Sequence, residues 1–381
     1  MKIMMVAGEA SGDLLGAQLL HGLHTRFPSL QAEGVGGPAM QQAGLVSRHD
    51  FRRLSIVGLL EVGRALPSLV GIFRDLLSWM RRERPLLLVT IDLPDFNFLL
   101  GRLAKRAGIP VVHYVSPQVW AWRPGRVHSL ARFLDHLLVL YPFEPRWYEN
   151  TTLPVHFVGH PLLKWAVPSR PREVIRAELG LEEGQELVVV LPGSRHGEIR
   201  RMLPVLARSC RLLRERRPRV RCVGALAATL TEGDIRQFWP AECGEPIPFY
   251  AGRTYDLLAA GDAGLITSGT ASLEAACLGL PMVVAYRVNA LTYQIGLRLI
   301  KTPFISLVNL ILGEGVVPER IQNEANPERL AQDVERFLAD PVGTSLTKEA
   351  FARMRHRLES PDCNAVDVVG NIMAGLTNKE R

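Results

Sequence analysis

Five polar segments of the chain carry residue types that can do chemistry, and each follows directly on a short apolar run. In chain order they are GEASGD (8–13), IDLPDFN (91–97), SPQVWAWR (116–123), PGSRHGE (192–198) and TSGTASLE (267–274). Carboxylates in the first two can act as a general base, whereas glycines and an arginine in the fourth can bind an anion. This combination is typical of an enzyme, and the arrangement of the segments decides what kind.

The PGSRHGE segment predicts a phosphate site. A Pro-Gly turn exposes the backbone amides of Gly193 and Ser194, and Arg195 follows where a helix begins. Amides and an arginine at a helix N-terminus both attract phosphate oxygens. A surface turn with a solvent-facing arginine is the plainer alternative.

The TSGTASLE segment predicts a second such site at another helix start. Ser268, Gly269 and Thr270 would offer amides there, and Glu274 lies one turn further on, where it can accept hydrogen bonds from ribose hydroxyls. A capping box is the alternative, but Thr270 to Glu274 is one residue too long for it. Two phosphate-binding helix starts in one domain suit a nucleoside diphosphate.

The two acidic segments predict a catalytic base. Asp92 ends an apolar strand and is the better base, whereas Asp95 follows a proline turn and shapes the loop. An Asx turn is the alternative for either aspartate. GEASGD resembles a phosphate loop but has carboxylates and no lysine, so Glu9 is interpreted as facing sugar hydroxyls near Asp92, and Asp13 as a helix-start carboxylate favoured by the helix dipole.

Two further segments remain open between a packing role and a binding role. Trp120 and Trp122 lie beside arginines and could stack on a sugar or pack between domains. Residues 68–84 form an amphipathic helix, preceded by the apolar stretch LSIVGLLEVG (54–63). That helix either packs on a sheet or meets a membrane interface or acyl chains; the residues predicted for the second role are Ile56, Val57, Leu59, Leu60, Leu69 and Phe73.

Continuous apolar runs alternate with helical patterns, which indicates strands of parallel sheets covered on both faces. The runs occupy residues 2–7, 86–91, 111–115 and 136–141, and again 186–192, 220–226, 262–266 and 281–286. A proline- and charge-rich stretch at 164–174 reads as a linker. The predicted fold class is therefore α/β, with two doubly wound Rossmann-like domains joined near residue 165, and ligands at the carboxyl ends of the strands.

The composition limits the classes of function that the chain can have. The chain has 381 residues, 47% hydrophobic, with a net charge of +7, which suits an anionic partner. It carries no nucleic-acid module, so no nucleic acid is expected as a partner. Five dispersed cysteines with no C-x-x-C pair argue against a disulfide framework or a zinc site. The absence of a signal peptide and of an uncharged run of ~18 apolar residues predicts a cytoplasmic protein.

With these motifs placed, the chain resembles the lipid-A-disaccharide synthase family, inverting glycosyltransferases of the two-domain GT-B type. The resemblance runs from Met5 to about Asn364 and rests on eight motifs in order: VAGEASGD, IDLPDFN, YVSPQVWAWR, PFE, FVGHPL, LPGSR with EI, SGTASLEA and PMVVAYR. It implies transfer of 2,3-diacylglucosamine from its UDP derivative to the 6-hydroxyl of 2,3-diacylglucosamine 1-phosphate, giving a β-1,6-linked lipid A precursor. It also implies two domains facing across a cleft, no cofactor and no metal.

The resemblance assigns roles to particular residues. Asp92 matches the catalytic aspartate, Glu9 the acidic residue of the first loop, and Arg195 the diphosphate-binding arginine. Glu274, Asn309 and Gln322 match nucleotide-side positions. Where many relatives read S-L-P-N, this chain has Val308 before Asn309, so its loop lacks the proline.

The implied organisation is an acceptor and membrane-side domain at 1–165, a UDP-sugar domain at 166–345, and a C-terminal segment at 346–381 that packs on the first domain. In the family that segment is exchanged between two subunits, which implies a possible homodimer. The implied location is the inner face of the inner membrane, as a peripheral protein.

Two other functions stay open. One is another UDP-sugar enzyme, either the N-acetylglucosaminyltransferase of peptidoglycan synthesis or a UDP-GlcNAc 2-epimerase. The basic and apolar stretch around 56–84 argues against an epimerase, which needs no lipid-facing surface. The other is a non-catalytic UDP-sugar or lipid-binding protein, which would have no use for Asp92.

Overall fold

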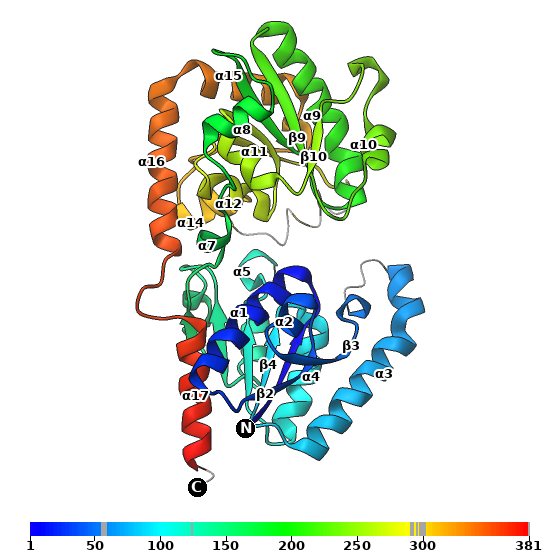
Figure 1. The fold of residues 1–381 in the computed structure, drawn as a ribbon, viewed down its shortest axis with the longest axis vertical. Helices are drawn as coiled ribbons and strands as arrows, with labels where there is room; N and C mark the ends of the chain where they lie inside the picture. The colour runs from blue at the N-terminus through cyan, green and yellow to red at the C-terminus, as the bar shows by residue number, and fades with distance from the viewer. Residues whose placement is uncertain (55–58, 123–124, 290–292, 295, 297–301, 380–381) are drawn as a thin grey trace. The chain divides into compact units, whose positions relative to one another are not determined.

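The structure is a computed structural model that describes the chain except residues 55–58, 123–124, 290–292, 295, 297–301 and 380–381. It divides into two compact units (Figure 1). Unit 1 consists of residues 1–160 and 358–381, and unit 2 consists of residues 161–357.

Unit 1 is built on a parallel sheet in the order β3-β2-β1-β4-β5-β6-β7. Its central strands are continuously buried, because helices cover both faces of the sheet. The strand bounds are β1 Lys2–Ala7, β2 Gln31–Val35, β3 Leu45–His49, β4 Leu87–Ile91, β5 Val111–Tyr114, β6 His136–Val139 and β7 Val155–Phe157.

The helices of unit 1 pack on this sheet along their apolar faces. In α3, for example, Ile72, Leu76, Trp79 and Met80 join the buried core formed by β1, β4, β5 and β6. The C-terminal helix α17 lies along α1, where Arg26 donates to Asn371 at 2.7 Å. The helix bounds are α1 Ala10–Arg26, α2 Pro38–Gln42, α3 Leu59–Glu83, α4 Pro94–Arg106, α5 Val119–Trp122, α6 Arg126–Leu130 and α17 Ala365–Lys379.

Unit 2 has the same kind of architecture. Its parallel sheet has the order β10-β9-β8-β11-β12-β13. The strand bounds are β8 Glu186–Leu191, β9 Val220–Leu226, β10 Phe249–Ala251, β11 Ala263–Thr267, β12 Met282–Tyr286 and β13 Glu319–Ile321. The helix bounds are α7 Leu162–Trp165, α8 Arg172–Glu178, α9 His196–Arg216, α10 Glu232–Phe238, α11 Thr254–Ala260, α12 Thr270–Cys277, α14 Leu307–Leu312, α15 Pro327–Ala339 and α16 Pro341–Leu358.

The predicted fold class of two doubly wound Rossmann-like sheets is confirmed. All eight predicted strands are present, within one or two residues of their expected bounds. The outer strands β2, β3, β7, β10 and β13 were not predicted, because they are short and several carry polar residues or glycine, as in QAEGV and LVSRH.

Two expected boundaries differ from the structure. The stretch 164–174 is tied to unit 2, since the amide and hydroxyl of Ser169 donate to Asp256 at 2.7 to 2.9 Å. The C-terminal segment begins later than residue 346, because α16 stays with unit 2 as far as Arg357. Arg357 donates to the carbonyls of Ile311 and Leu312 at the end of α14, at 2.8 and 2.7 Å.

Candidate active site

The loop after β4 holds the predicted base in a strained backbone. Asp92 and Leu93 both have left-handed conformations, with φ of 49° and 48°. Such a conformation costs a residue with a side chain about 1–2 kcal/mol, so surrounding contacts must maintain it. The Asp92 amide donates to the carbonyl of Tyr114 on β5 at 2.9 Å, which continues the sheet pairing by one residue.

Two side chains keep this loop in place. The Asn97 amide group donates to the carbonyls of Asp92 and Ile91 at 2.7 and 3.2 Å. The Leu93 side chain packs over Gly8, where a Cβ atom would lie 2.5 Å from Leu93 Cδ2. A side chain at the position of Gly8 would therefore force the end of the Leu93 side chain to move.

The electrostatic surroundings of Asp92 suit a base. Burial raises the pKa of its carboxyl above the ordinary value, and the charge of Glu9 raises it further. Glu9 is exposed at the start of α1. The structure therefore brings the two predicted acidic residues together at adjacent strand ends. A raised pKa makes a carboxylate a stronger base near neutral pH.

Asp13, by contrast, has a structural role. Its buried carboxylate accepts hydrogen bonds from the amides of Ala39 and Met40, each at 3.0 Å, at the start of α2. The sequence predicted that Asp13 interacts with the start of its own helix, α1. Its hydrogen-bond partners lie instead at the start of α2. It is not a ligand group.

Glu144 is a buried carboxyl on the same sheet edge. It accepts hydrogen bonds from the amides of Leu140 and Tyr141 at 3.1 and 3.0 Å, where β6 ends. Burial raises its pKa to about 8. Burial raises the pKa of the Tyr141 hydroxyl, and the charges of Glu144 and Asp92 raise it further. One edge of this sheet therefore carries Glu9, Asp92, Tyr141 and Glu144.

The tryptophan segment packs inside unit 1 in the part that the structure describes. Trp120 is buried with an edge-to-face contact to Phe143, at a ring separation of 5.4 Å. A buried ring cannot serve as an open platform for a sugar, so Trp120 has a packing role. The side chain of Trp122 lies outside the described residues.

The loop Pro192–Arg195, which we call the anion loop, follows β8 in unit 2. Gly193 has φ +112°, a conformation that glycine adopts without strain. The carboxylate of Glu198, in the first turn of α9, accepts hydrogen bonds from the Ser194 amide at 3.1 Å and from the Arg195 guanidinium at 3.2 Å. Arg195 is the N-cap residue of α9, and its side chain is 70% exposed.

A second helix start lies on the neighbouring strand. Gly269 is the N-cap residue of α12, between Ser268 and Thr270, and no side chain caps this helix. Burial raises the pKa of Glu274, and the Tyr255 hydroxyl donates to its carboxylate at 3.4 Å. Because β8 and β11 pair directly, both predicted helix starts lie on the same edge of this sheet.

Asn309 and Gln322 brace the backbone of unit 2. The Asn309 Oδ1 accepts from the amides of Val316 and Val317, and its Nδ2 donates to the Val317 carbonyl and to Glu319, all within 2.8 to 3.0 Å. The amide of Asn309 has thus used both donors and both lone pairs, so in this geometry it has none for a nucleotide. Gln322 exchanges two hydrogen bonds with the backbone of Val288, at 2.8 and 3.1 Å.

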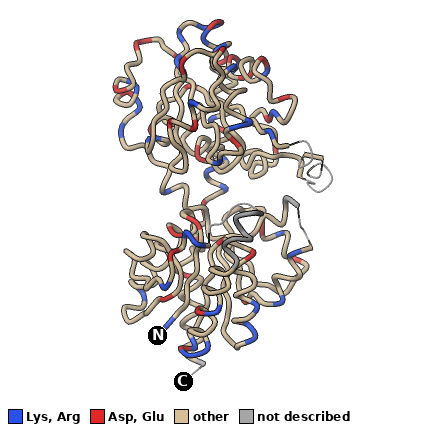
Figure 2. Tube along the Cα trace, turned by 90° about the vertical axis from the view of Figure 1, so that its right-hand side faces the viewer, with Lys and Arg blue, Asp and Glu red and all other residues tan. Residues whose placement is uncertain are grey.

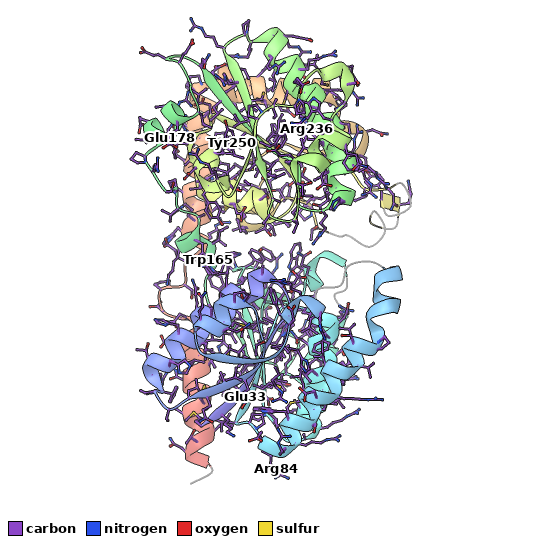
Figure 3. The ribbon with its side chains drawn as sticks, turned by 45° about the vertical axis from the view of Figure 1, so that its right-hand side comes forward. Glu33, Arg84, Trp165, Glu178, Arg236 and Tyr250 are labelled. Atoms are coloured by element: carbon purple, nitrogen blue, oxygen red, sulfur yellow. The ribbon has the colours of Figure 1, made fainter. Side chains whose placement is uncertain are left out.

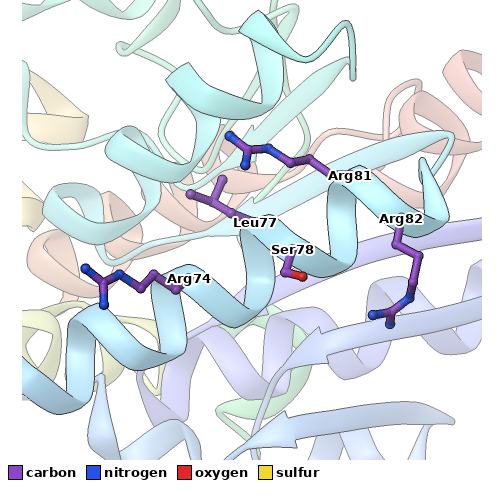
Figure 4. Close-up of a pocket in the computed structure, with 5 residues that line it drawn as sticks. All are labelled: Arg74, Leu77, Ser78, Arg81 and Arg82. Carbon is purple, nitrogen blue, oxygen red and sulfur yellow. The ribbon is translucent and has the colours of Figure 1, made fainter.

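The predicted lipid-facing residues lie on or before α3. Leu69 and Phe73 are half-buried and pack against the core of unit 1. Ile56 and Val57 lie outside the described residues, and the side chains of Leu59 and Leu60 do too, although both belong to α3. The outer side of α3 has an open hollow of about 410 Å³ lined by Arg74, Leu77, Ser78, Arg81 and Arg82 (Figure 4).

Sequence reasoning missed Asn97, Glu144 and Glu198 as functional positions. Asn97 and Glu198 lie inside motifs that carried other predictions, and Glu144 closes the PFE motif directly after the β6 strand. Only the folded backbone shows that Asn97 and Glu144 satisfy main-chain groups at strand ends. The available signal was their position five to seven residues after the end of a buried strand.

Sequence comparisons with known proteins agree on one family. Residues 3–368 match the family model described as lipid-A-disaccharide synthetase. A lipid-A-disaccharide synthase of Geobacter metallireducens is 42% identical over 100% of this chain and 98% of its own, and one of Alkalilimnicola ehrlichii is 43% identical over 94% of each. A solved structure, described as a UDP-N-acetylglucosamine 2-epimerase from Listeria monocytogenes, has a TM-score of 0.62 at 13% identity, covering 100% of this chain and 96% of its own, which shows a shared fold alone.

Proposed function

The chain belongs to the lipid-A-disaccharide synthetase family, and from this premise we propose that it joins two acylated glucosamines into the lipid A disaccharide. The donor is UDP-2,3-diacylglucosamine and the acceptor is 2,3-diacylglucosamine 1-phosphate. UDP leaves as a β-1,6 bond forms. The observation that carries the proposal, besides family membership, is a partly buried aspartate with a raised pKa in a left-handed backbone at a strand end.

Asp92 acts as the general base in this reaction. It takes the proton of the acceptor 6-hydroxyl as that oxygen attacks the anomeric carbon from the side opposite UDP. The nearby carboxylate of Glu9 supports this role by raising the pKa of Asp92, and it can accept a hydrogen bond from an acceptor hydroxyl. Inversion follows from the single displacement.

The anion loop and the start of α12 bind the leaving UDP. Arg195 and the amides of Gly193 and Ser194 stabilise charge that develops on the diphosphate, and Ser268–Thr270 contribute amides from the adjacent strand end. Glu274 accepts hydrogen bonds from the ribose hydroxyls. Asn309 and Gln322 support this side through the backbone that they hold, since their amide groups bond to protein.

Incubation of the purified protein with both substrates, followed by mass spectrometry, tests the proposal directly. The expected product is the disaccharide 1-phosphate, and UDP should appear in equal amount. Asp92→Asn, whose turnover is expected to be much lower, serves as the control. Absence of product from the wild-type protein with both verified substrates would refute the proposal.

The same assay separates the alternatives. An epimerase of the kind that shares the fold would convert UDP-N-acetylglucosamine to its 2-epimer without an acceptor, which nuclear magnetic resonance would detect. A peptidoglycan N-acetylglucosaminyltransferase would use UDP-N-acetylglucosamine with a lipid-linked acceptor. A binding protein would hold UDP-sugars without turnover.

We further propose that unit 1 binds peripherally to the inner face of the inner membrane through α3. No helix among the described residues has the length and apolar character to cross a bilayer. Basic and acidic residues are interspersed over most of the chain (Figure 2), but the outer side of α3 groups Arg74, Arg81 and Arg82 around one hollow. Arginines near an anionic lipid surface each contribute about 1 kcal/mol to binding.

Sedimentation with anionic and neutral phospholipid vesicles tests this surface. Replacing the three arginines by glutamine should weaken binding to anionic vesicles roughly 10- to 100-fold. A matched control replaces three exposed arginines of unit 2, Arg214, Arg219 and Arg236, the last of which is labelled in Figure 3. Equal losses in both variants would show a net-charge effect and refute the surface.

We also propose that the chain forms a homodimer in which the C-terminal helix is exchanged. In the structure α17 packs on α1 of its own chain, with Val366 against Gly22 and with Val369 and Met373 buried. An exchanged helix would make the same contacts with the partner's α1, so the two arrangements preserve one interface. Light scattering that gives a monomer mass at micromolar concentration would refute the exchange.

A further inference from the structure

Glu198 occupies two donors that the proposed diphosphate site requires. Its Oε2 accepts from the Ser194 amide at 3.1 Å, and its Oε1 accepts from the Arg195 guanidinium at 3.2 Å. A carboxylate and a phosphate compete for such groups, because both are oxyanions that accept hydrogen bonds from N–H donors. Glu198 therefore takes the position of an anion at the anion loop.

The packing of Glu198 is close. A Cβ atom at Gly193 would lie 2.8 Å from Glu198 Oε2 and 2.9 Å from Glu198 Cβ, so the glycine makes room for this side chain. The Glu198 side chain is only 17% exposed, whereas its partner Arg195 is 70% exposed. The carboxylate thus lies inside the loop, with the guanidinium on its solvent side.

This contact differs from an ordinary helix cap. In a capping box, a glutamate at the third helical position accepts from the amide of the N-cap residue itself, here Arg195. Glu198 instead accepts from the preceding residue, Ser194, and from the arginine side chain. The Ser194 carbonyl is held separately, by the Thr229 hydroxyl at 2.5 Å, so the loop has an anchor that does not depend on Glu198.

Charges of both signs act on Tyr286, at the end of β12. Burial raises the pKa of its hydroxyl and the charge of Glu198 raises it further, whereas the charges of Arg195 and Arg201 lower it. A negative charge from Glu198 therefore lowers the positive potential that two arginines create here. A diphosphate that entered this space would meet both the arginines and the carboxylate.

We propose that Glu198 is an internal competitor of the diphosphate, which weakens nucleotide binding and speeds the departure of UDP. This inference rests on the proposed function, because it needs the anion loop to bind the diphosphate. An ion pair with one exposed partner is weak, so a multiply charged diphosphate can displace it when the donor binds. The carboxylate returns to Ser194 and Arg195 as UDP leaves.

Glu198→Gln tests the inference, because glutamine keeps the size and can still accept from the Ser194 amide. Removing the charge should lower the Kd for UDP about three- to tenfold, measured by calorimetry. The Kd for uridine, which has no phosphate, should not change. Glu183→Gln is the matched control, since Glu183 is exposed and precedes β8 at the opposite end of the strand.

Three outcomes decide between the possibilities. Unchanged or weaker UDP binding by Glu198→Gln, with an unchanged melting temperature, would overturn the inference and indicate that Glu198 orients Arg195. Equal gains for UDP and uridine would also overturn it. Tighter UDP binding by Glu198→Gln in the wild-type background, with no such gain when Glu198→Gln is added to Arg195→Ala, would support competition for the guanidinium.

Failure of the proposed function is distinguishable from failure of this inference. If Arg195→Ala alone binds UDP as tightly as the wild-type protein, the diphosphate lies elsewhere and the anion loop assignment is wrong. If Arg195→Ala weakens UDP binding while Glu198→Gln does not tighten it, the anion loop remains the proposed diphosphate site. Only the role of Glu198 as a competitor is then wrong. Product inhibition by UDP provides the kinetic readout, with a lower inhibition constant expected for Glu198→Gln.

Discussion

The loops that follow β4 in unit 1 and β8 in unit 2 have similar topology but give their polar side chains different surroundings. Both turn sharply through left-handed backbone, but Asp92 and Leu93 do so with side chains, whereas Gly193 does so with none. The Asp92 loop is held by Asn97 and packed on Gly8, so its carboxyl is partly buried. The anion loop leaves Arg195 mostly exposed.

The difference teaches that a base and an anion site need opposite surroundings. Burial raises the pKa of a carboxyl, which makes it a better base but costs stability when it ionises. An anion site must keep its donors accessible and needs no burial. In the proposed reaction the strained, braced loop therefore serves the proton transfer, and the relaxed glycine loop serves phosphate binding.

The largest expected effect comes from removing the base. Asp92→Asn should lower kcat by on the order of 10²- to 10⁴-fold, because the amide cannot accept the acceptor's proton. The Kd for UDP should not change, since the anion loop is untouched. Near-normal turnover in this variant would remove Asp92 from its role and break the comparison.

The pH profile of the wild-type enzyme sharpens the same assignment. The pKa of Asp92 is raised, so the acid limb of kcat/KM should lie above pH 3.8, and activity should fall as the pH drops through that limb. The residual activity of Asp92→Asn should lack this limb. An acid limb that persists unchanged in the variant would belong to another group.

The next effect tests the cost of burying carboxyls in unit 1. The folded pKa of Glu144, about 8, lies above its ordinary value of 4.5, so folding favours the protonated form. Its contribution to stability is present below about pH 4.5 and is lost as the pH rises through 8. Glu144→Gln should therefore gain about 2–4 kcal/mol relative to the wild type between pH 5 and pH 9.

Urea denaturation of both proteins across this pH range measures that gain. Comparison with the wild type cancels the contributions of other titrating groups. Free energies of unfolding that stay parallel across the range would show that Glu144 does not titrate as its burial indicates.

A smaller effect is expected from the exposed arginine of unit 2. Arg195→Ala should weaken UDP binding by about 1.5–3 kcal/mol, or roughly 10- to 150-fold, because it removes a charge-assisted hydrogen bond to the diphosphate. The melting temperature should hardly change, since this side chain is mostly exposed. Arg236→Ala, at an exposed position of α10, is the control and should bind UDP normally.

The smallest effect concerns the brace of the Asp92 loop. Asn97→Ala removes the donor to the carbonyls of Ile91 and Asp92 and should cost about 1–2 kcal/mol of stability. It should lower kcat while leaving the Kd for UDP unchanged, because the loop belongs to unit 1. Asn323→Ala, at an exposed position of unit 2, is the control. Wild-type kcat in Asn97→Ala would show that the strained backbone holds without it.

Much of the fold was readable in the sequence because central strands of a parallel sheet are buried on both faces. LLVTI of β4 and ELVVVL of β8 are continuous apolar runs for that reason. Outer strands such as β13, ERI, are half-buried and carry charge, so their assignment depends on pairing with a neighbour. The end of unit 2 at Arg357, not near 345, likewise follows from contacts made by α16.

The sequence by itself determined the family, the fold class and the identity of the residues that follow each buried strand. Strand ends and helix starts are local features, so Asp92, Arg195 and Ser268–Thr270 could be placed without a structure. Tertiary structure decided which predicted side chains are exposed to a ligand and which are hydrogen-bonded or packed within the protein. The Asn309 amide group bonds to Val316, Val317 and Glu319 of its own unit, and Trp120 is buried against Phe143.

Tertiary structure also decided the electrostatics. Burial of Glu144 and the meeting of Glu198 with Ser194 and Arg195 depend on distances that spacing along the chain does not fix. The physical reason is that hydrogen bonding and desolvation act through space over a few ångströms. Apolar periodicity records which elements form, and only the folded chain sets the charges that act on each side chain.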